Sequence, residues 1–356
     1  MAFVSQARGV TYIQRVRHAA DACRELGFDT VCLPPVTLDD ALPVAELERA
    51  VGDRRIEAVV LHRVVSSPSL TALLDRCRQW GAAAIYDADD LVFGPDYPLL
   101  FDELGRGRHP DLLDQAIRAR QAVQQIDRAW AATPVLAEAM YDIGVADVTV
   151  VPNSYSSLQQ FVASRARRAP FDSPHLVIGY GSGSGTHACD LGLVAEPLAA
   201  VLDRLPQARF HFVGRERLPA PLAQRSDRVL QTDPVRYADL SAVIARWNIS
   251  LAPVVPRPFN EAKSELKFID ASLVAVPTVA SPTEVMRQAI VPGQTGLLAA
   301  SATQWHEAVL ELSRDRVRRT LLGARARRDV HERYGPDARR AAVAASLARQ
   351  PLSVSA

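Results

Sequence analysis

Two lysines and a serine lie where a buried strand would turn into a helix, in the stretch FNEAKSELKFIDASLVAVPTVAS, residues 259–281. The preceding ISLAPVV predicts a buried strand, and SELKFIDASLVAV predicts a helix that begins near Ser264. A helix N-terminus carries about half a positive charge and unpaired amides, so Lys263 beside it favours an anionic ligand. The alternative is that Ser264 caps the helix and the lysines are solvated, and both interpretations fit this stretch alone.

A second candidate is the loop GYGSGSGTHACD, residues 179–190, which follows the predicted strand HLVIG. Its glycines would let backbone amides approach a phosphate, and the serines, Thr186 and His187 add further donors. The segment has neither the GxGxxG spacing of a dinucleotide site nor the GK[ST] of a P-loop. Taken by itself, a loop of this composition is more often a turn than a site.

The third candidate is YDADD, residues 86–90, at the end of the predicted strand AAAIYDA. Three carboxylates after a buried strand could bind a divalent cation or orient a substrate hydroxyl, or simply cap the residues that follow. His62 ends the predicted strand IEAVVLHRVV beside Arg63. A single histidine in such a place is more often structural than catalytic.

Length and composition limit the scaffold that positions these residues. A chain of 356 residues suits two domains. With 41 Lys and Arg against 40 Asp and Glu, and no basic stripe interleaved with aromatics, no nucleic-acid partner is expected. The absence of an apolar leader and of any run of about 18 apolar residues predicts a cytoplasmic protein that could still contact a membrane surface. The cysteines lack CxxC spacing and predict small core residues, not a zinc site or disulfides: Cys23, Cys32, Cys77 and Cys189.

Short apolar runs alternate with helical patterns along the chain, which predicts α/β domains with parallel sheets covered on both faces. We expect one such domain in residues 1–153, a linker in 154–174 and a second domain in 175–333. A C-terminal helix over 334–349 could pack back on the first domain, and 350–356 would form a tail. Strands are predicted at 28–35, 56–65, 82–88, 128–134 and 147–153, and again at 175–180, 208–214, 227–232, 249–255, 277–281 and 295–300.

Together these segments resemble the retaining group 1 (GT4-like) glycosyltransferases, whose GT-B fold consists of two tandem Rossmann-like, doubly wound domains facing each other across a cleft. Four segments carry the resemblance in order between residues 147 and 335: IGYGSGSGTHACD, RFHFVG, the 259–281 stretch, and GQTGLL followed by W-x-x-A-V-L. The N-terminal half is a looser match, through LHRVV, AIYDADDLVF and AATPVLAEAMYDIGV-x(5)-VPNS.

The resemblance implies a nucleotide diphosphate sugar as donor, bound mainly on the second domain, and a glycan, lipid-linked or small-metabolite acceptor on the first. It implies that no cofactor and no metal are required. The catalytic residues expected are Asp89, Asp90, Glu261 and Lys263. The residues expected to hold the donor are Gly181, Ser182, Gly183, Thr186, His187, Arg215, Asn260, Lys263, Ser264, Glu265, Leu266, Lys267 and Asp270.

This chain departs from the family pattern in two places. Ala262 and Asp270 stand where relatives have two glutamates eight residues apart, so Glu261 would have to substitute for the first. Thr186 and His187 stand where many relatives carry an Arg and a Lys. The alternative function is therefore a nucleotide-sugar-binding protein that has lost turnover, with an epimerase or phosphorylase of the same fold as a lesser alternative.

Overall fold

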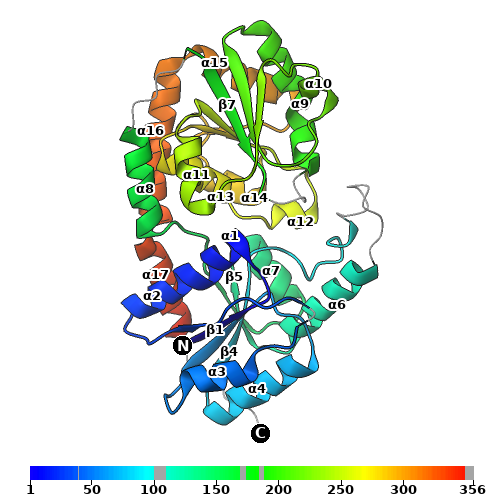
Figure 1. Ribbon diagram of the computed structural model, residues 1–356, viewed down its shortest axis with the longest axis vertical. Helices are drawn as coiled ribbons and strands as arrows, with labels where there is room; N and C mark the ends of the chain where they lie inside the picture. Colours follow the sequence, from blue (N-terminus) through cyan, green and yellow to red (C-terminus); the bar gives the residue numbers. More distant parts are fainter. Residues whose placement is uncertain (39, 100–109, 169–173, 184–187, 349–356) are drawn as a thin grey trace. The chain divides into compact units, whose positions relative to one another are not determined.

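The structure is a computed structural model of the 356-residue chain, and it describes every residue except 39, 100–109, 169–173, 184–187 and 349–356. The chain divides into two compact units. Unit 1 comprises Met1–Ser154, Ala262–Ser264 and Pro336–Ala356, and unit 2 comprises Tyr155–Glu261 and Glu265–Gly335. Each unit is a parallel sheet with helices on both faces (Figure 1), which confirms the predicted fold class of two Rossmann-like domains.

Unit 1 is built on a six-stranded parallel sheet in the order β2-β1-β3-β4-β5-β6. Ser5 pairs in register with His62, and His62 pairs with Asp87, so these three residues lie side by side at the carboxyl ends of their strands. The strands are β1 Ala2–Ser5, β2 Val31–Cys32, β3 Ala58–His62, β4 Ala83–Ala88, β5 Arg128–Ala131 and β6 Asp147–Val150.

The first strand, β1, was not predicted. All four of its residues are buried, so the strand has no polar face and no alternation of apolar and polar positions. The run AFVS is also short and contains a single β-branched residue, Val4. A central strand of a parallel sheet can therefore be too short for its composition to identify it.

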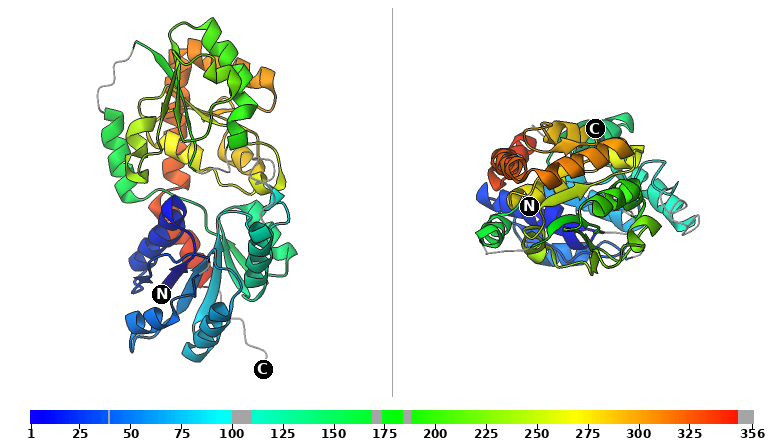
Figure 2. Two further views of the ribbon diagram at one scale, coloured as in Figure 1. Left: turned by 45° about the vertical axis from the view of Figure 1, so that its right-hand side comes forward. Right: turned by 90° about the horizontal axis from the view of Figure 1, so that it is seen from above.

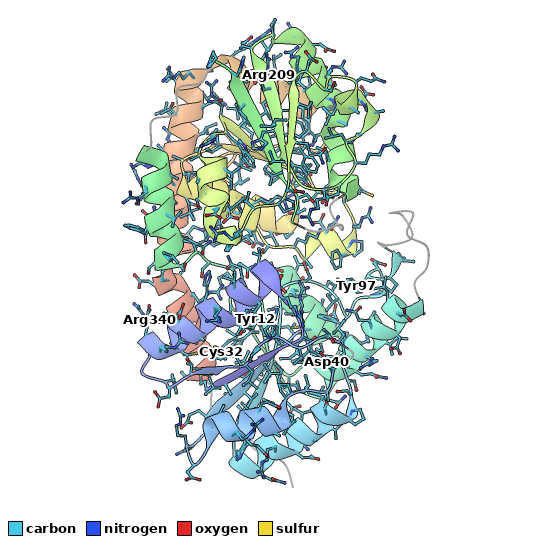
Figure 3. The ribbon with its side chains drawn as sticks, in the orientation of Figure 1. Tyr12, Cys32, Asp40, Tyr97, Arg209 and Arg340 are labelled. Carbon is cyan, nitrogen blue, oxygen red and sulfur yellow. The ribbon has the colours of Figure 1, made fainter. Side chains whose placement is uncertain are left out.

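The helices of unit 1 include one from the far C-terminal end of the chain. Helix α17, Pro336–Leu347, lies beside α2, His18–Glu25 (Figures 1 and 2). Arg340 of α17, labelled in Figure 3, forms an ion pair with Glu25. Val343 is fully buried in the same core as Phe3 and Trp130. The remaining helical segments are α1 Gly9–Tyr12, the π-helical η1 Ile13–Arg17, α3 Val44–Val51, α4 Pro68–Trp80, α6 Pro110–Gln124 and α7 Pro134–Asp142.

Unit 2 has a six-stranded parallel sheet in the order β12-β11-β10-β7-β8-β9, the strand order of dinucleotide-binding domains. All six strands of the predicted second series are present. They are β7 Leu176–Gly181, β8 Ala208–Val213, β9 Val229–Thr232, β10 Ile249–Ala252, β11 Thr278–Ala280 and β12 Leu297–Leu298.

Helices pack on the two faces of this sheet, with Trp305 in one core and Trp247 in the other. The residues predicted as a linker, 154–174, contain α8, Ser157–Arg168, which packs on α11. The sequence did not predict this helix because its large apolar side chains, Leu158 and Phe161, are exposed, whereas the small Ala163 is buried. Its apolar residues therefore do not mark the buried face. The helices are α8, α9 Ala188–Arg204, α10 Ala220–Ala223, α11 Tyr237–Ile244, α12 Pro258–Glu261, α13 Leu266–Leu273, α14 Glu284–Ala289, α15 Ala302–Arg314 and α16 Arg316–Arg333.

All four cysteines are free thiols, and Cys23 and Cys77 are buried, as predicted for core residues. Burial raises the pKa of each of these two thiols to about 12, so they remain protonated and unreactive at neutral pH. None of the helices in the described ranges combines the length and the apolar composition needed to cross a membrane.

Candidate functional site

In open parallel sheets, ligands bind beyond the carboxyl ends of the strands, at the switch point where the strand order reverses. The switch point of unit 2 lies between β7 and β10, and the loops that follow these strands contain the glycine-rich stretch and the 259–281 stretch. The switch point of unit 1 lies between β1 and β3, next to β4 and its aspartates. All three candidate stretches therefore follow strands at or beside a switch point.

The glycine-rich stretch, residues 179–190, begins inside β7 with a glycine that packing requires. A side chain at Gly179 would overlap the ring of Trp247, so this glycine serves the core of unit 2. Apart from its chain neighbours, no described residue has an atom within 4 Å of a Cβ placed on Gly183, so that position leaves room for a ligand. Ser182 donates a hydrogen bond to Glu216 Oε1 at 2.6 Å. Thr186 and His187 lie outside the described residues.

Helix α13 begins at Leu266, two residues later than predicted, and buries Ile269 and Leu273. Asp270 is buried in the same helix and accepts a hydrogen bond from the Tyr237 hydroxyl at 3.3 Å. Burial raises the pKa of Asp270 to about 7, and the Tyr237 hydrogen bond and nearby Lys267 only partly oppose this. Asp270 is thus a carboxyl group whose charge has few donors to stabilise it.

Glu265 is the residue that precedes α13 and is also buried. Its side chain makes a hydrogen bond with Tyr334, burial raises its pKa, and its Oε2 atom has no hydrogen-bond partner among the described residues. Lys267, two residues later in the chain, places its ammonium 5.8 Å from the centre of the Tyr180 ring. This end of α13 therefore combines a buried carboxyl group and a lysine.

Three other predicted residues make contacts that have structural functions. Asn260 donates to the carbonyl of Val255 at 2.8 Å, and Arg215 pairs with the exposed Asp233. Glu261 accepts a hydrogen bond from the backbone amide of Glu284 at 3.0 Å, at the first residue of α14. In this structure Glu261 thus stabilises a helix N-terminus.

Ala262 is fully buried, and its carbonyl accepts a hydrogen bond from the Thr133 hydroxyl at 3.0 Å. A glutamate in this place would have to bury its longer side chain and its charge.

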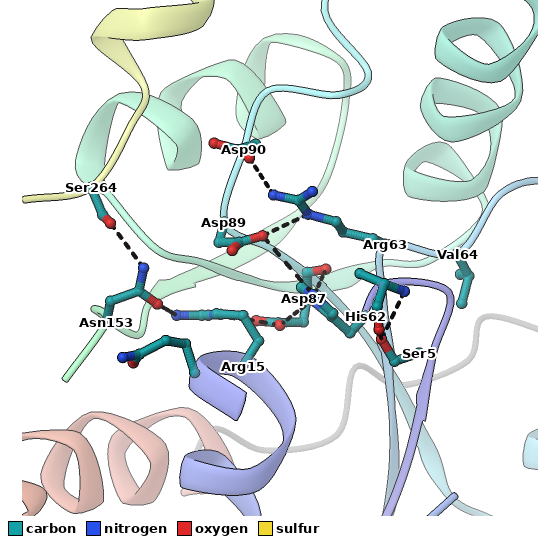
Figure 4. Close-up of polar contacts among 12 residues, drawn as sticks. Ser5, Arg15, His62, Arg63, Val64, Asp87, Asp89, Asp90, Asn153 and Ser264 are labelled. Atoms are coloured by element: carbon teal, nitrogen blue, oxygen red, sulfur yellow. Dashed lines mark hydrogen bonds and ion pairs between the residues drawn. The ribbon is translucent and has the colours of Figure 1, made fainter. Parts of the chain in front are cut away.

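Ser264 does not cap α13, because its hydroxyl is bonded elsewhere. Its Oγ accepts a hydrogen bond from Asn153 Nδ2 at 2.8 Å (Figure 4), and residues 262–264 belong to unit 1. Lys263 is close enough to Asp90 for its charge to act on the pKa of that carboxyl group. The predicted pair of diphosphate ligands, Lys263 and Ser264, is therefore joined to residues of the first sheet.

The aspartates after β4 belong to a buried network of charged groups (Figure 4). Asp87 is fully buried and accepts hydrogen bonds from Arg15 Nε at 3.2 Å and from His62 Nδ1 at 2.8 Å. Burial alone would raise the pKa of Asp87, but Arg15 and His62 outweigh it and lower the pKa to about 2. Asp87 is thus a fixed anion that orients the imidazole ring of His62.

Because Asp87 engages Nδ1 of His62, the other ring nitrogen, Nε2, is left without a hydrogen-bond partner among the described residues. Nε2 lies 4.0 Å from Asp89 Oδ1. Arg63 Nε donates to this same Asp89 oxygen at 2.6 Å, and Arg63 Nη2 also pairs with Asp90. Arg63 outweighs the effect of burial and lowers the pKa of Asp89, whereas burial raises that of Asp90.

The backbone of Arg63 has φ of +51°, a left-handed conformation that is uncommon for a residue with a long side chain. Such a residue costs of order 1–3 kcal/mol and persists only where its surroundings hold it. Here the amide of Arg63 donates to the carbonyl of Asp87 at 3.0 Å, and the guanidinium is held by Asp89 and Asp90. Strain of this kind at a strand end is typical of functional sites.

Sequence reasoning missed Arg15, Asn153 and Tyr237, and it considered His62 and Arg63 without their partners. Arg15 lies in the π-helical segment η1, an irregularity that often occurs at functional sites but that the sequence pattern does not show. The partners Arg15 and Asp87 are 72 residues apart in the chain. Among the described residues, no group of three or more His, Cys, Asp or Glu side chains could hold a metal ion.

The profile of a family described as "Glycosyl transferases group 1" matches residues 186–315. A comparison with curated protein sequences found no match. Solved structures similar over nearly the whole chain include HepE from Anabaena in complex with UDP, with 14% identity, TM-score 0.68 and coverage of 98% of this chain and 99% of HepE.

Sucrose-phosphate synthase from Thermosynechococcus elongatus has 16% identity and TM-score 0.66, and 97% of each chain is covered. TarM from S. aureus, solved with UDP, has 13% identity and TM-score 0.61 over 86% of this chain and 58% of TarM. The two tandem domains described above are thus those of GT-B glycosyltransferase structures, as the sequence motifs indicated.

Proposed function

We propose that this chain, whose residues 186–315 match the profile of the group 1 glycosyltransferases, transfers a sugar from a nucleotide diphosphate sugar to an acceptor hydroxyl with retention of configuration. The observation that carries the proposal is the pair of switch points, each with polar groups suited to one substrate. Buried, under-bonded carboxyl groups and a lysine follow the strands of unit 2, and a charge-paired network follows those of unit 1.

Unit 2 would bind the donor. Asp270 would accept hydrogen bonds from ribose hydroxyls, which supply the donors that this buried carboxyl group lacks in the free protein. The amides around Gly181, Ser182 and Gly183, with Lys267, would stabilise the leaving diphosphate as the bond to the sugar breaks. HepE was solved with UDP and with UDP-glucose, so UDP-glucose is the first donor to test.

Unit 1 would bind the acceptor. Asp89 keeps one carboxylate oxygen on Arg63, which fixes its orientation and keeps it ionised. Its second oxygen would accept the hydrogen bond of the attacking hydroxyl. The cationic partners of Asp87 and Asp89 are the guanidinium groups of Arg15 and Arg63, which already balance the charge of these two carboxylates. We therefore propose a reaction that needs no metal.

One observation favours the alternative, a nucleotide-sugar-binding protein without turnover. Ala262 is buried where the family resemblance places a glutamate beside the donor sugar, and Glu261 is bonded to the start of α14. Without a carboxylate in that place, the donor sugar would lose one contact that orients it. Binding of the donor without any transfer or hydrolysis would support this alternative.

The proposed function is tested by a thermal-shift screen with UDP, GDP, dTDP and ADP, followed by incubation with the sugar conjugates of each nucleotide that binds. We expect a nucleotide diphosphate to stabilise the protein and its sugar conjugate to be hydrolysed slowly or transferred. NMR of the product should show the anomeric configuration of the donor. Turnover should persist in EDTA, and activity that EDTA abolishes and manganese or magnesium restores would contradict the metal-free mechanism.

A further inference from the structure

Unit 1 contains a cavity of about 240 Å³ to which no function has been assigned above. It lies at the switch point between β1 and β3, because its walls include residues that directly follow both strands. The polar side chains in its wall are Gln6, Arg8, Thr11, Arg63, Tyr97 and Gln115.

The neutral amides in the wall already have partners. The Gln6 side chain donates to the carbonyl of Thr37 at 3.1 Å and accepts from the amide of Val65 at 2.9 Å. Gln115 forms a side-chain hydrogen bond with Tyr97. These groups fix the shape of the cavity, so the arginines and Thr11 are the side chains that can offer donors to a ligand.

The two arginines give the cavity a positive lining, and the described residues that line it include no carboxylate. Arg63 uses Nε and Nη2 for Asp89 and Asp90, which leaves Nη1 as a donor. The Arg8 side chain is exposed and makes no hydrogen bond to a described residue. The acid whose pKa responds to Arg8 is Asp40, which is itself bonded to the amide of Thr37.

We propose that this cavity binds an anionic group, a carboxylate or a phosphate, on a hydroxylated acceptor. Guanidinium groups match the geometry of both anions. The volume equals roughly eight water molecules at about 30 Å³ each, which suits one sugar ring with its charged substituent.

The inference rests on the proposed function, because it identifies the substrate class of unit 1. Arg63 both lines the cavity and holds Asp89. An anion bound by Arg8 and Arg63 would therefore bring a neighbouring hydroxyl of the same molecule to Asp89. The cavity would in this way select the acceptor and orient the hydroxyl that reacts.

The test compares three probes on the full chain by titration calorimetry: glucose, glucuronate and glucose 6-phosphate. We expect glucuronate, glucose 6-phosphate or both to bind about tenfold more tightly than glucose, the range for a charged hydrogen bond. The stronger of the two anionic probes identifies the carboxylate or the phosphate as the preferred group. High salt should weaken the anionic probe but not glucose.

Arg8→Gln should remove the preference for the anionic probe, and Arg8→Lys should keep part of it. Arg24→Gln, in an exposed ion pair of α2, is the matched control and should change nothing. Equal binding of all three probes, or an Arg8→Gln variant that binds like the native protein, would overturn the inference.

Binding of an anionic probe in a protein that transfers no sugar would overturn the proposed function and leave the anion site standing. Sugar transfer to neutral acceptors at a rate that Arg8→Gln does not change would support the proposed function and overturn the anion site.

Discussion

The buried carboxyl groups of the two units are held in opposite ways. In unit 1, Asp87 and Asp89 are paired with guanidinium groups, and their pKa values are lowered. In unit 2, Asp270 and Glu265 are hydrogen-bonded to tyrosine hydroxyls, and burial raises their pKa values. Asp87 and Asp89 are therefore ionised at neutral pH, whereas burial disfavours the ionised form of Asp270 and Glu265.

This difference indicates two kinds of preparation for a ligand. Unit 1 neutralises Asp87 and Asp89 with its own arginines, so these two carboxylates are paired before a substrate arrives and can hold a reacting group in place. Unit 2 leaves its carboxyl groups short of donors, so a ligand with hydroxyl groups would complete their hydrogen bonds and favour ionisation. Ligand binding should therefore be coupled to pH in unit 2 more than in unit 1.

The largest expected effect comes from removing the cation of a buried pair. Arg15→Met leaves Asp87 buried without its main partner, and we expect a loss of about 3–5 kcal/mol in the free energy of unfolding. Urea denaturation followed by circular dichroism measures this. The control is Arg24→Gln, whose exposed pair with Asp21 should matter by less than about 0.5 kcal/mol. If both variants lost the same free energy of unfolding, the buried pair of Arg15 and Asp87 would not stabilise the fold more than an exposed pair does.

A smaller effect is expected from Asp89→Asn, which retains an acceptor for Arg63 but removes the carboxylate. We expect turnover to fall about hundredfold, the lower range for the loss of a general base, while UDP affinity stays nearly unchanged. Steady-state kinetics and calorimetry measure the two quantities. Asp114→Asn on the exposed face of α6 serves as the control. A matching loss of UDP affinity would place Asp89 at the donor.

The pH dependence of nucleoside binding tests whether Asp270 of unit 2 must be ionised to bind a ligand. Because the pKa of Asp270 is raised to about 7, its ionised fraction falls about tenfold between pH 8 and pH 6. Uridine affinity should fall by about the same factor, and the Asp270→Asn variant should bind uridine without this dependence. Uridine is preferable to UDP because it has no phosphate that titrates in this range. Uridine binding that is independent of pH in the native protein would contradict this role.

The same shift has a consequence for stability, whose sign follows from linkage. A carboxyl group with a raised folded pKa contributes stability below its unfolded value near 3.8, and this is lost as the pH rises through about 7. Asp270→Asn should therefore be more stable than the native protein at pH 8. Thermal unfolding at pH 5 and pH 8 shows whether the difference between the two proteins grows with pH.

The smallest expected effect is that of the link between Ser264 and the network of unit 1. Ser264→Ala removes the hydrogen bond from Asn153, and we expect a loss of about 0.5–1.5 kcal/mol in the free energy of unfolding. A double-mutant cycle with Asn153→Ala measures the coupling between the two side chains. Unchanged stability together with weaker UDP binding would show that Ser264 serves the diphosphate alone.

The sequence was sufficient for the two sheets because eleven of their twelve strands follow from apolar runs that alternate with helical patterns, with β1 as the exception. It also suggested Asp89, Asp90 and Asp270 as site residues, through strand ends and family resemblance, and their roles stay predictions. It could not show that Arg15 reaches Asp87, because that contact depends on sheet register and a π-helical turn. Glu261 illustrates the same limit, since its bond to the start of α14 is made 23 residues away.

The chain passes between the two units four times, after Ser154, Glu261, Ser264 and Gly335. Unit 1 therefore emerges first from a ribosome but is finished last, because Val343 and Ser346 of α17 complete its core around Trp130. Unit 2, whose residues end at Gly335, can fold before this happens. A fragment that stops near residue 154 would lack part of its own interior, so the first unit should be produced only as part of the whole chain.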